Sequence, residues 1–409
     1  MRGRELVGQR SETVRRANLS AIARELHDRG ALSRSELVAR TGLTRSAIRG
    51  LIAEFVAANL ALETRSEPDG LPGRPSPLVQ PRREAAVVLA LEIAVDSLAA
   101  AIVGLGGTTI EKLRIDLPRG HSSVEAVTRD LVRLTGKLRH LPRLRPALLG
   151  VGVAIVGVVR RDDGQVSTAP NLGWRDVPLG ARLTTALDVG VPTFIANDAD
   201  LGALIELRRG AARGADDLLF IAGEVGVGGG IVVAGRPLTG VAGYAGEIGH
   251  ISVNPAGRPC RCGSTGCWET EIGEEALLRR AGVPAEGGRR AVDQVIAAAA
   301  AGERQALAAV DEVGRWLGIG IAGLVNVLNP RVVVLGGLFS KLAPRLIPRV
   351  EEELDRFALA APRANVRVAA AQLGMDAPLL GAAELAFEPF LADPAAWLGA
   401  RDDVAAASA

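Results

Sequence analysis

The segment Gly243–Glu269, GYAGEIGHISVNPAGRPCRCGSTGCWE, contains all three cysteines of the chain, Cys260, Cys262 and Cys267. His250 lies ten residues before the first of them. One neutral imidazole and three thiolates form a complete tetrahedral Cys₃His set, of the closed kind that is structural rather than catalytic. Buried thiols or a disulfide are the alternatives, but a Cys-x-Cys pair makes a poor disulfide and an odd total leaves one thiol over. The spacing therefore predicts a structural Zn²⁺ site.

Two motifs in this segment resemble the signature of the ROK family, which groups bacterial repressors, open reading frames and sugar kinases. They are Glu247-Ile248-Gly249-His250 and the run CRCGSTGCWE at residues 260–269. In that family the histidine and the cysteines hold zinc, which agrees with the set predicted above. The resemblance further implies that Glu247, His250 and Glu269 line a sugar pocket beside the zinc loop.

The resemblance extends over nearly the whole chain, from about Arg15 to about Pro389. It implies an α/β ligand domain with two lobes of the actin/hexokinase-like type, preceded by a winged helix-turn-helix. We expect a DNA-binding domain with wing and linker at residues 1–82, the sugar-binding domain with its zinc loop at 83–390, and a tail at 391–409. A chain of 409 residues is long enough for two or three such units.

The composition predicts a cytoplasmic globular protein. Apolar residues make up 48% of the chain, which supports a large core. No uncharged apolar run reaches the length of about 18 residues that a membrane span needs. The charged N-terminus, MRGRELVGQRSETVRR, lacks the apolar stretch of a secretory signal, and three clustered cysteines suit a reducing compartment.

Charge is distributed unevenly along the chain. Residues 1–82 contain 14 arginines and 9 acidic residues, a balance of +5, whereas the whole chain carries only +2. A small basic head on a neutral or acidic body is typical of a nucleic-acid-binding module joined to a ligand domain. A bias in genomic base composition would explain the choice of arginine over lysine, but it would not explain the asymmetry.

Helical signals divide the head into three helices. Apolar positions at helical spacing predict the first helix at residues 15–28, namely Leu19, Ile22, Ala23 and Leu26. A capping box of Ser33 and Glu36 begins the second helix, which ends at Gly42, and Thr44 caps the third. Two helices joined by a short turn that contains glycine predict a helix-turn-helix.

The predicted DNA-binding residues of the third helix are Thr44, Arg45, Ser46 and Arg49. Side chains at the start of a recognition helix reach base edges and phosphates in the major groove. A short strand at residues 61–63, followed by a Gly- and Pro-rich loop at 66–81, predicts a wing whose Arg74 can enter a minor groove. The alternative is a solvated basic face on an ordinary three-helix bundle.

Two phosphate-binding loops of ROK kinases have altered counterparts in this chain. Where the kinases resemble Asp-Ile-Gly-Gly-Thr, the chain has Glu92-Ile93-Ala94-Val95-Asp96. Side chains at Ala94 and Val95 would obstruct a phosphate, and Asp96 adds a like charge. Where the kinases have a Gly-Thr-Gly type sequence, Glu224-Val225-Gly226 replaces a hydroxyl donor and adds a carboxylate. These changes predict a pocket that holds a sugar without phosphorylating it.

A strand expected at residues 192–196 ends at Asn197-Asp198. In ROK kinases the asparagine binds sugar hydroxyls and the aspartate is the base for the attacking hydroxyl, so the resemblance implies a sugar contact at Asn197 and a vestigial base at Asp198. A carboxylate at the carboxyl edge of a strand is well placed for a ligand. The alternative for Asp198 is a helix N-cap, which is compatible with ligand binding. Asn171 is a further candidate, in a loop that resembles a family loop near the sugar.

These features together predict a sugar-responsive transcriptional regulator, a repressor of carbohydrate-metabolism genes rather than an enzyme. The predicted partners are a double-stranded DNA operator, a sugar or sugar phosphate, and further copies of the chain in a homodimer or homotetramer. A DNA-binding ROK sugar kinase and a zinc-dependent interaction module without a small ligand are the alternatives. The other three histidines, His27, His121 and His140, are expected at the surface.

Overall fold

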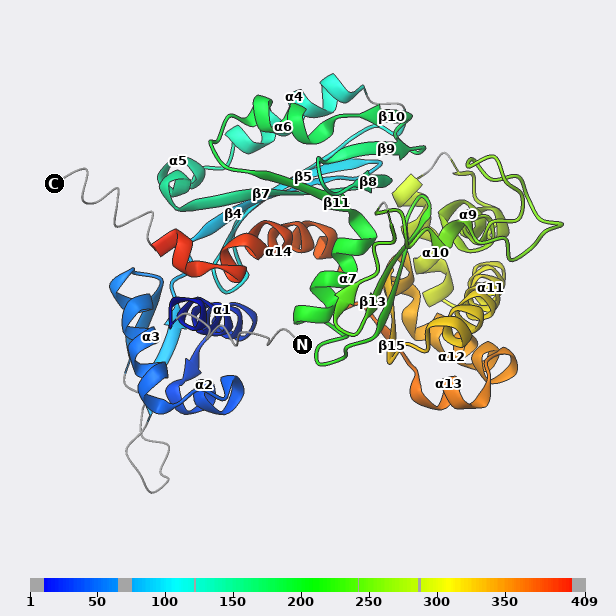
Figure 1. Ribbon diagram of the computed structural model, residues 1–409. Coiled ribbons are helices and arrows are strands. Elements are labelled where there is room, and N and C mark those ends of the chain that lie inside the picture. The colour runs from blue at the N-terminus through cyan, green and yellow to red at the C-terminus, as the bar shows by residue number, and fades with distance from the viewer. Residues whose placement is uncertain (1–10, 65–75, 121–122, 242, 286–287, 399–409) are drawn as a thin grey trace, which may run out of the picture.

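The computed structural model describes residues 11–64, 76–120, 123–241, 243–285 and 288–398. Figure 1 shows a small head at the lower left and two α/β lobes, one above and one to the right. Among the described residues, no helix is long and apolar enough to cross a membrane. The lobes confirm the predicted mixed α/β class.

The head contains three helices, α1 (Ser11–Arg29), α2 (Arg34–Thr41) and α3 (Arg45–Ala57). The predicted capping box begins α2, because Ser33 Oγ accepts from Glu36 N while the Glu36 carboxylate accepts from Ser33 N. Thr44 is the N-cap of α3, as predicted. The local sequence signals therefore place all three helices.

A three-stranded antiparallel sheet in the order β1-β3-β2 completes the head. Its strands are β1 (Leu32–Ser33), β2 (Ala61–Thr64) and β3 (Leu78–Pro81). The central strand β3 lies where the sequence predicts only loop, because Gly and Pro before it conceal a short apolar run. The rest of the predicted wing, including Arg74, lies outside the described residues.

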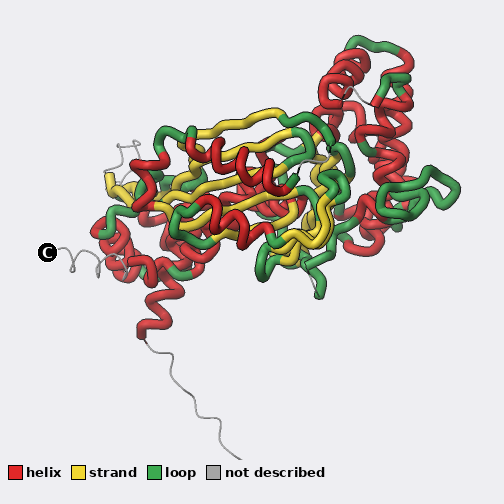
Figure 2. Tube along the Cα trace, turned by 90° about the horizontal axis from the view of Figure 1, so that it is seen from above, coloured by secondary structure: helices red, strands yellow, loops and turns green. Residues whose placement is uncertain are grey.

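The first lobe is built on a five-stranded sheet in the order β11-β7-β4-β5-β6, in which β4, β7 and β11 run parallel. The strands are β4 (Val87–Ile93), β5 (Ser97–Gly104), β6 (Thr108–Asp116), β7 (Leu148–Ile155) and β11 (Thr193–Asn197). Helices α4 (Val124–Gly136) and α6 (Leu179–Leu187) cover the outer face, and the view from above shows helices lying over these strands (Figure 2).

Shorter elements of the first lobe lie beside this sheet. A small antiparallel sheet in the order β10-β9-β8 is formed by β8 (Val158–Arg160), β9 (Gln165–Ala169) and β10 (Trp174–Val177). The short helix α5 (Leu141–Leu144) and the 3₁₀ turn η1 (Arg145–Ala147) lead into β7. The small sheet follows β7 directly, so it extends the carboxyl edge of the main sheet.

The second lobe has a sheet in the order β14-β13-β12-β15-β16. Its strands are β12 (Leu218–Gly223), β13 (Val227–Val233), β14 (Arg236–Pro237), β15 (Val332–Gly337) and β16 (Arg367–Ala370). Its helices are α8 (Trp268–Ile272), α9 (Glu274–Arg280), α10 (Gly288–Ala300), α11 (Arg304–Leu328), α12 (Leu338–Phe357) and α13 (Ala360–Asn365), and its 3₁₀ turns are η2 (Ile248–His250) and η4 (Gly374–Asp376). Strand β15 ends at Gly336-Gly337, and α12 begins directly after it.

Two helices, α7 (Asp198–Arg209) and α14 (Ala377–Ala392), lie between the two sheets (Figure 1). Although α14 follows the second lobe in sequence, it packs against β7 of the first lobe, where a Cβ on Gly152 would lie 1.8 Å from the Ala382 carbonyl oxygen. The layers are therefore the first sheet, α14, α7 and the second sheet.

The last helix also joins the head to the first lobe. One apolar cluster includes Leu19 and Ile22 of α1 together with Leu379 and Phe387 of α14. The boundary predicted at residue 390 falls inside α14, which runs to Ala392. Trp397 then packs edge-on against Phe390, with ring centroids 5.6 Å apart, so the first part of the predicted tail is packed on the molecule.

Candidate functional site

The predicted metal residues form a compact cluster. One ligand atom from each of His250, Cys260, Cys262 and Cys267 lies within 4.8 Å of all the others. The Cys262 and Cys267 sulfurs are 3.6 Å apart, and the Cys260 sulfur is 3.7 Å from His250 Nδ1. A tetrahedral ion with Zn–S bonds of about 2.3 Å requires ligand separations of about 3.7 Å. The cluster therefore fits a tetrahedral metal ion.

Tight turns and one buried anchor hold these four side chains together. A Cβ on Gly266, which has φ of 71°, would lie 1.7 Å from the Asn254 carbonyl oxygen, so only glycine allows this approach. The buried Trp268 donates from Nε1 to the Trp316 carbonyl oxygen at 2.8 Å, which fixes the end of the loop to α11. The glycines of the motif thus serve the geometry of the turns.

A cavity of about 600 Å³ lies between the two lobes, next to the cysteine cluster. All five predicted sugar-binding residues line it, namely Asn197, Asp198, Glu247, His250 and Glu269. Carboxylates, an amide and an imidazole are the groups that recognise hydroxyls by accepting and donating hydrogen bonds. The fold therefore brings together residues that are up to 72 positions apart in the sequence.

Asn197 and Asp198 have different tasks at the end of β11. Asn197 is the N-cap of α7, because its Oδ1 accepts from Ala199 N at 2.8 Å and Asp200 N at 3.2 Å. Its Nδ2 donates to the Gly157 carbonyl oxygen at 2.9 Å. The N-cap considered for Asp198 is thus supplied by Asn197, and the Asp198 carboxyl group faces the cavity.

Two acidic groups in the cavity have strongly shifted acidities. Burial at the bottom of the cavity, followed by the negative charge of Glu224, raises the pKa of Asp198 well above its ordinary value. Burial, followed by the charges of Glu92 and Asp96, raises the pKa of Glu224 to about 7. Both carboxyl groups therefore hold protons at higher pH than ordinary surface acids.

His250 connects the metal cluster to the cavity. Its Nδ1 faces Cys260, whereas its Nε2 lies 3.9 Å from Glu247 Oε2. Glu269 Oε1 accepts from the Cys260 thiol at 2.8 Å and also lines the cavity. One ring nitrogen can thus serve a metal ion while the other side of the ring remains available in the cavity.

Several lining residues were missed by the sequence analysis. Arg175 on β10 and Arg261 between two cysteines both border the cavity. Arg261 Nη1 donates to Asn171 Oδ1 at 3.1 Å, which places the further sugar candidate Asn171 at the same wall. The one sequence signal was the position of Arg261 inside the Cys-x-Cys motif, and no local pattern indicates Arg175.

The other side of the interlobe cleft is occupied by ion pairs. Asp96, in the turn after β4, binds Arg119 Nη2 at 2.9 Å and Arg289 Nη2 at 2.6 Å. Arg119 also binds Glu274 of the second lobe. Only a small pocket of about 50 Å³ remains here. The negative charge of Asp96, which the sequence analysis set against a phosphate, is balanced here by two guanidinium groups.

The predicted DNA-binding side chains of the head lie at the surface. Thr44, Arg45, Ser46 and Arg49 are all exposed at the start of α3. Within the part of the chain that the structure describes, neither Arg45 nor Arg49 is engaged in an ion pair. Both guanidinium groups are therefore free of acidic partners among those residues.

The pocket between two α/β lobes and the Cys₃His cluster both agree with a family match. A model of the ROK family matches residues 88–388. The chain belongs to the ROK family. The match spans both lobes, the cavity and the metal cluster.

Other ROK proteins differ in how much of this chain they match. The xylose repressor of Bacillus subtilis is 26% identical over 383 residues, 92% of this chain and 97% of its own length. The glucokinase of Halalkalibacterium halodurans is 34% identical over 298 residues, 69% of this chain and 89% of its own length. A solved ROK transcriptional regulator, described as a homologue of Escherichia coli Mlc, superposes with a TM-score of 0.74 at 25% identity, covering 93% of this chain and 97% of that one.

Proposed function

We propose that this ROK protein is a sugar-responsive, DNA-binding transcriptional repressor of carbohydrate-metabolism genes. The observation that carries the proposal is that the chain combines a basic head with a cavity lined by the predicted sugar-binding residues. The other side of the same cleft, where a kinase would bind phosphates, is occupied by ion pairs. We call it the phosphate side. A repressor requires the first two features and does not require a nucleotide site. A kinase requires space and donors for phosphates where Asp96, Arg119 and Glu274 stand.

The similar proteins support this choice through the head. The xylose repressor matches 92% of this chain, whereas the glucokinase matches 69%. The head lies before residue 88, where the family model begins, so the family match covers the body alone. Kinase activity remains the second candidate, favoured by the 34% identity to the glucokinase.

We infer that the head is a winged helix-turn-helix. Helices α2 and α3 are joined by a turn at Gly42, which has φ of 70°, and β2 and β3 form the two strands beside the predicted wing. In this arrangement α3 enters the major groove with Arg45 and Arg49 toward the DNA, and Arg74 contacts an adjacent minor groove.

We infer that the ion of the Cys₃His cluster is structural Zn²⁺. His250, Cys260, Cys262 and Cys267 would fill four tetrahedral positions, which leaves no open position for a reacting water molecule. When bound, zinc would fix the loop that carries Glu247 and Glu269. In the cavity, Asn197, Asp198, Glu247, His250 and Glu269 would then contact the sugar hydroxyls.

The decisive experiment measures operator binding by fluorescence anisotropy against D-glucose, D-xylose, N-acetyl-D-glucosamine and their phosphates. Each titration is done with and without Mg²⁺–ATP, beside a coupled assay for ADP. We expect a sugar to change the operator Kd without ATP and with no ADP release, because the phosphate side is occupied. A sugar response that requires ATP, or ADP release at enzymatic rates, would instead establish the kinase.

The head is tested separately. Replacing Arg45 or Arg49 by Ala should weaken operator binding by about 1–3 kcal/mol for each bidentate hydrogen-bonded pair with a base that the substitution removes. Arg236→Ala, at an exposed arginine on β14 of the body, is the matched control and should leave operator binding unchanged.

We also propose a homodimer or homotetramer, since helix-turn-helix proteins often bind palindromic sites as dimers. Sedimentation velocity measures the oligomeric state.

A further inference from the structure

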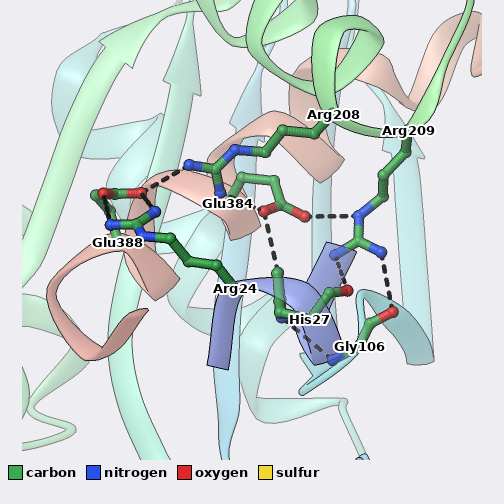
Figure 3. Close-up of polar contacts among 7 residues, drawn as sticks. All are labelled: Arg24, His27, Gly106, Arg208, Arg209, Glu384 and Glu388. Carbon is green, nitrogen blue, oxygen red and sulfur yellow. Dashed lines mark hydrogen bonds and ion pairs between the residues drawn. The ribbon is translucent and has the colours of Figure 1, made fainter. Parts of the chain in front are cut away.

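His27 is buried at the contact between the head and the body, and the expectation of a surface position is wrong. Its side chain is 0% exposed and lies between the aromatic ring of Phe387, 4.6 Å away, and the carboxylate of Glu384. Burial by α14, more than 350 positions away in sequence, explains the error. Figure 3 shows the surrounding cluster of polar contacts, formed by Arg24, His27, Gly106, Arg208, Arg209, Glu384 and Glu388.

Glu384 of α14 is the centre of this cluster. It accepts from His27 Nε2 at 3.0 Å, from Arg208 Nη1 at 2.8 Å and from Arg209 Nε at 2.8 Å. Burial alone would raise the pKa of Glu384, but His27 and the two arginines outweigh it and hold that pKa well below its ordinary value. The carboxylate is therefore ionised at neutral pH, and Arg208 and Arg209 of α7 each contact one side of it.

The backbone fixes the tautomer of His27. Its Nδ1 faces the Gly106 N–H at 3.2 Å, and a backbone N–H can only donate. The proton consequently lies on Nε2, which donates to Glu384. The His27 side chain therefore joins α1 to the turn after β5 and to α14.

Arg209 binds the head directly with its planar guanidinium group. Nη2 donates to the His27 carbonyl oxygen at 2.8 Å and Nη1 to the Gly106 carbonyl oxygen at 3.0 Å, while Nε serves Glu384. One turn along α14, Glu388 binds Arg208 at 2.7 Å and Arg24 of α1 at 2.6 Å. The last two residues of α7 therefore contact α1 both directly and through α14.

The other end of α7 lies at the cavity that we propose binds the sugar. Asn197 caps the helix and Asp198, its first residue, lines the cavity. Twelve residues at about 1.5 Å each make the helix about 18 Å long. A Cβ on Gly381 would lie 2.1 Å from the Leu201 carbonyl oxygen, so the backbones of α14 and α7 are in close contact.

We infer that α7 couples the sugar pocket to the DNA-binding head, and that Arg208 and Arg209 are the positioning residues that transmit the change. This inference rests on the function proposed above and names the route of its regulation. A sugar that draws Asp198 and the capped first turn toward the second lobe would shift the whole helix. Because Arg209 holds the His27 carbonyl oxygen, the shift changes the orientation of α1 and with it α3.

The coupling is tested by comparing two substitutions at the same head–body contact. Arg209→Gln removes the direct contacts of α7 with the His27 and Gly106 carbonyl oxygens. Asp393→Asn removes the ion pair between Arg16 of α1 and the end of α14, which involves no residue of α7, and is the matched control. For each protein we measure the sugar Kd by calorimetry and the ratio of the operator Kd values with and without that sugar.

We expect Arg209→Gln to keep the sugar Kd within about twofold but to reduce the operator ratio at least fivefold toward 1. Asp393→Asn should retain the wild-type ratio. A wild-type ratio in Arg209→Gln would overturn the inference while leaving the proposed function intact. No operator response in the wild-type protein would instead contradict the proposed function itself, so the two failures are distinguishable.

A second measurement needs no substitution and remains decisive if Arg209→Gln does not fold. Hydrogen–deuterium exchange of the wild-type protein is compared with and without whichever of D-glucose, D-xylose and N-acetyl-D-glucosamine binds. Exchange should change in the last turn of α1, which contains His27, although that turn lines no part of the cavity. Changes confined to the loops around the cavity would refute the coupling.

Discussion

The two sides of the interlobe cleft differ sharply. On the sugar side, a cavity of about 600 Å³ is lined by the five residues predicted to bind a sugar, next to the Cys₃His cluster. On the phosphate side, Asp96, Arg119, Arg289 and Glu274 pair across the lobes and leave about 50 Å³. The sugar side keeps its polar groups available to a ligand, whereas the phosphate side uses them for contacts within the protein.

This difference shows that the two halves of one cleft can use their polar groups in different ways. Asp96 of the β4–β5 turn pairs with Arg289 of α10, and Arg119, which follows β6, pairs with both Asp96 and Glu274 of α9. These ion pairs connect the two lobes. A ligand on the sugar side then acts on two lobes that are already joined at one edge. The predictions below test whether the two sides are independent, beginning with the largest expected effect.

Loss of the metal should lower both the stability of the protein and its affinity for the sugar. Cys262→Ser should abolish stoichiometric zinc and lower the free energy of unfolding by about 4 kcal/mol or more, because a structural ion contributes to folding directly. Sugar affinity should fall as well, since Glu247 and Glu269 flank the loop. Zinc content is measured by mass spectrometry and stability by urea denaturation. Arg258→Gln, exposed in the same loop, is the control; unchanged zinc in Cys262→Ser would exclude the assignment.

The phosphate side should show its own pH dependence through Glu224. Its pKa of about 7 exceeds the ordinary value of 4.5, so the proton is bound more tightly in the folded state. The stabilisation is complete below pH 4.5 and is lost as the pH rises through 7, up to about 3 kcal/mol. Glu224→Gln should therefore match the wild type at pH 4 and exceed its stability at pH 8. Parallel stability curves of the two proteins from pH 5 to 8 would contradict the shift.

Asp198→Asn should weaken the sugar side without affecting the metal. An amide offers one acceptor oxygen where a carboxylate offers two, so sugar binding should weaken by about 10- to 100-fold, or about 1.5–3 kcal/mol. Calorimetry measures the affinity, and zinc content should stay at one per chain. Asp293→Asn, at an exposed pair in the second lobe, is the control. An unaltered sugar Kd would remove Asp198 from the binding site.

The smallest effect is expected from opening the phosphate side. Arg289→Gln removes one ion pair of Asp96 while Arg119 remains, so stability should fall by about 1 kcal/mol or less. Mg²⁺–ATP should still give no thermal stabilisation, because the side chains of Ala94 and Val95 remain. Arg143→Gln, at the exposed pair with Glu84 in the first lobe, is the control. Stabilisation by ATP in this variant alone would show that the ion pairs are what excludes the nucleotide.

Local signals were sufficient for several parts of the molecule. The capping box at Ser33 and Glu36, the cap at Thr44 and the strand before Asn197 all follow from patterns within a few residues. Short apolar runs next to Gly and Pro were a weaker signal for secondary structure, and strand β3 was missed for that reason.

The sequence by itself determined the helices of the head, the Cys₃His set that the fold gathers into one cluster, and five residues that line the cavity, because each has a local pattern or belongs to a motif. Only the tertiary structure decided that Asp96 is neutralised by Arg119 and Arg289, and that His27 is buried against Glu384. A charged or polar residue carries no local mark of its distant partner. Its environment is set by the elements that the fold packs against it, as α14 does for His27.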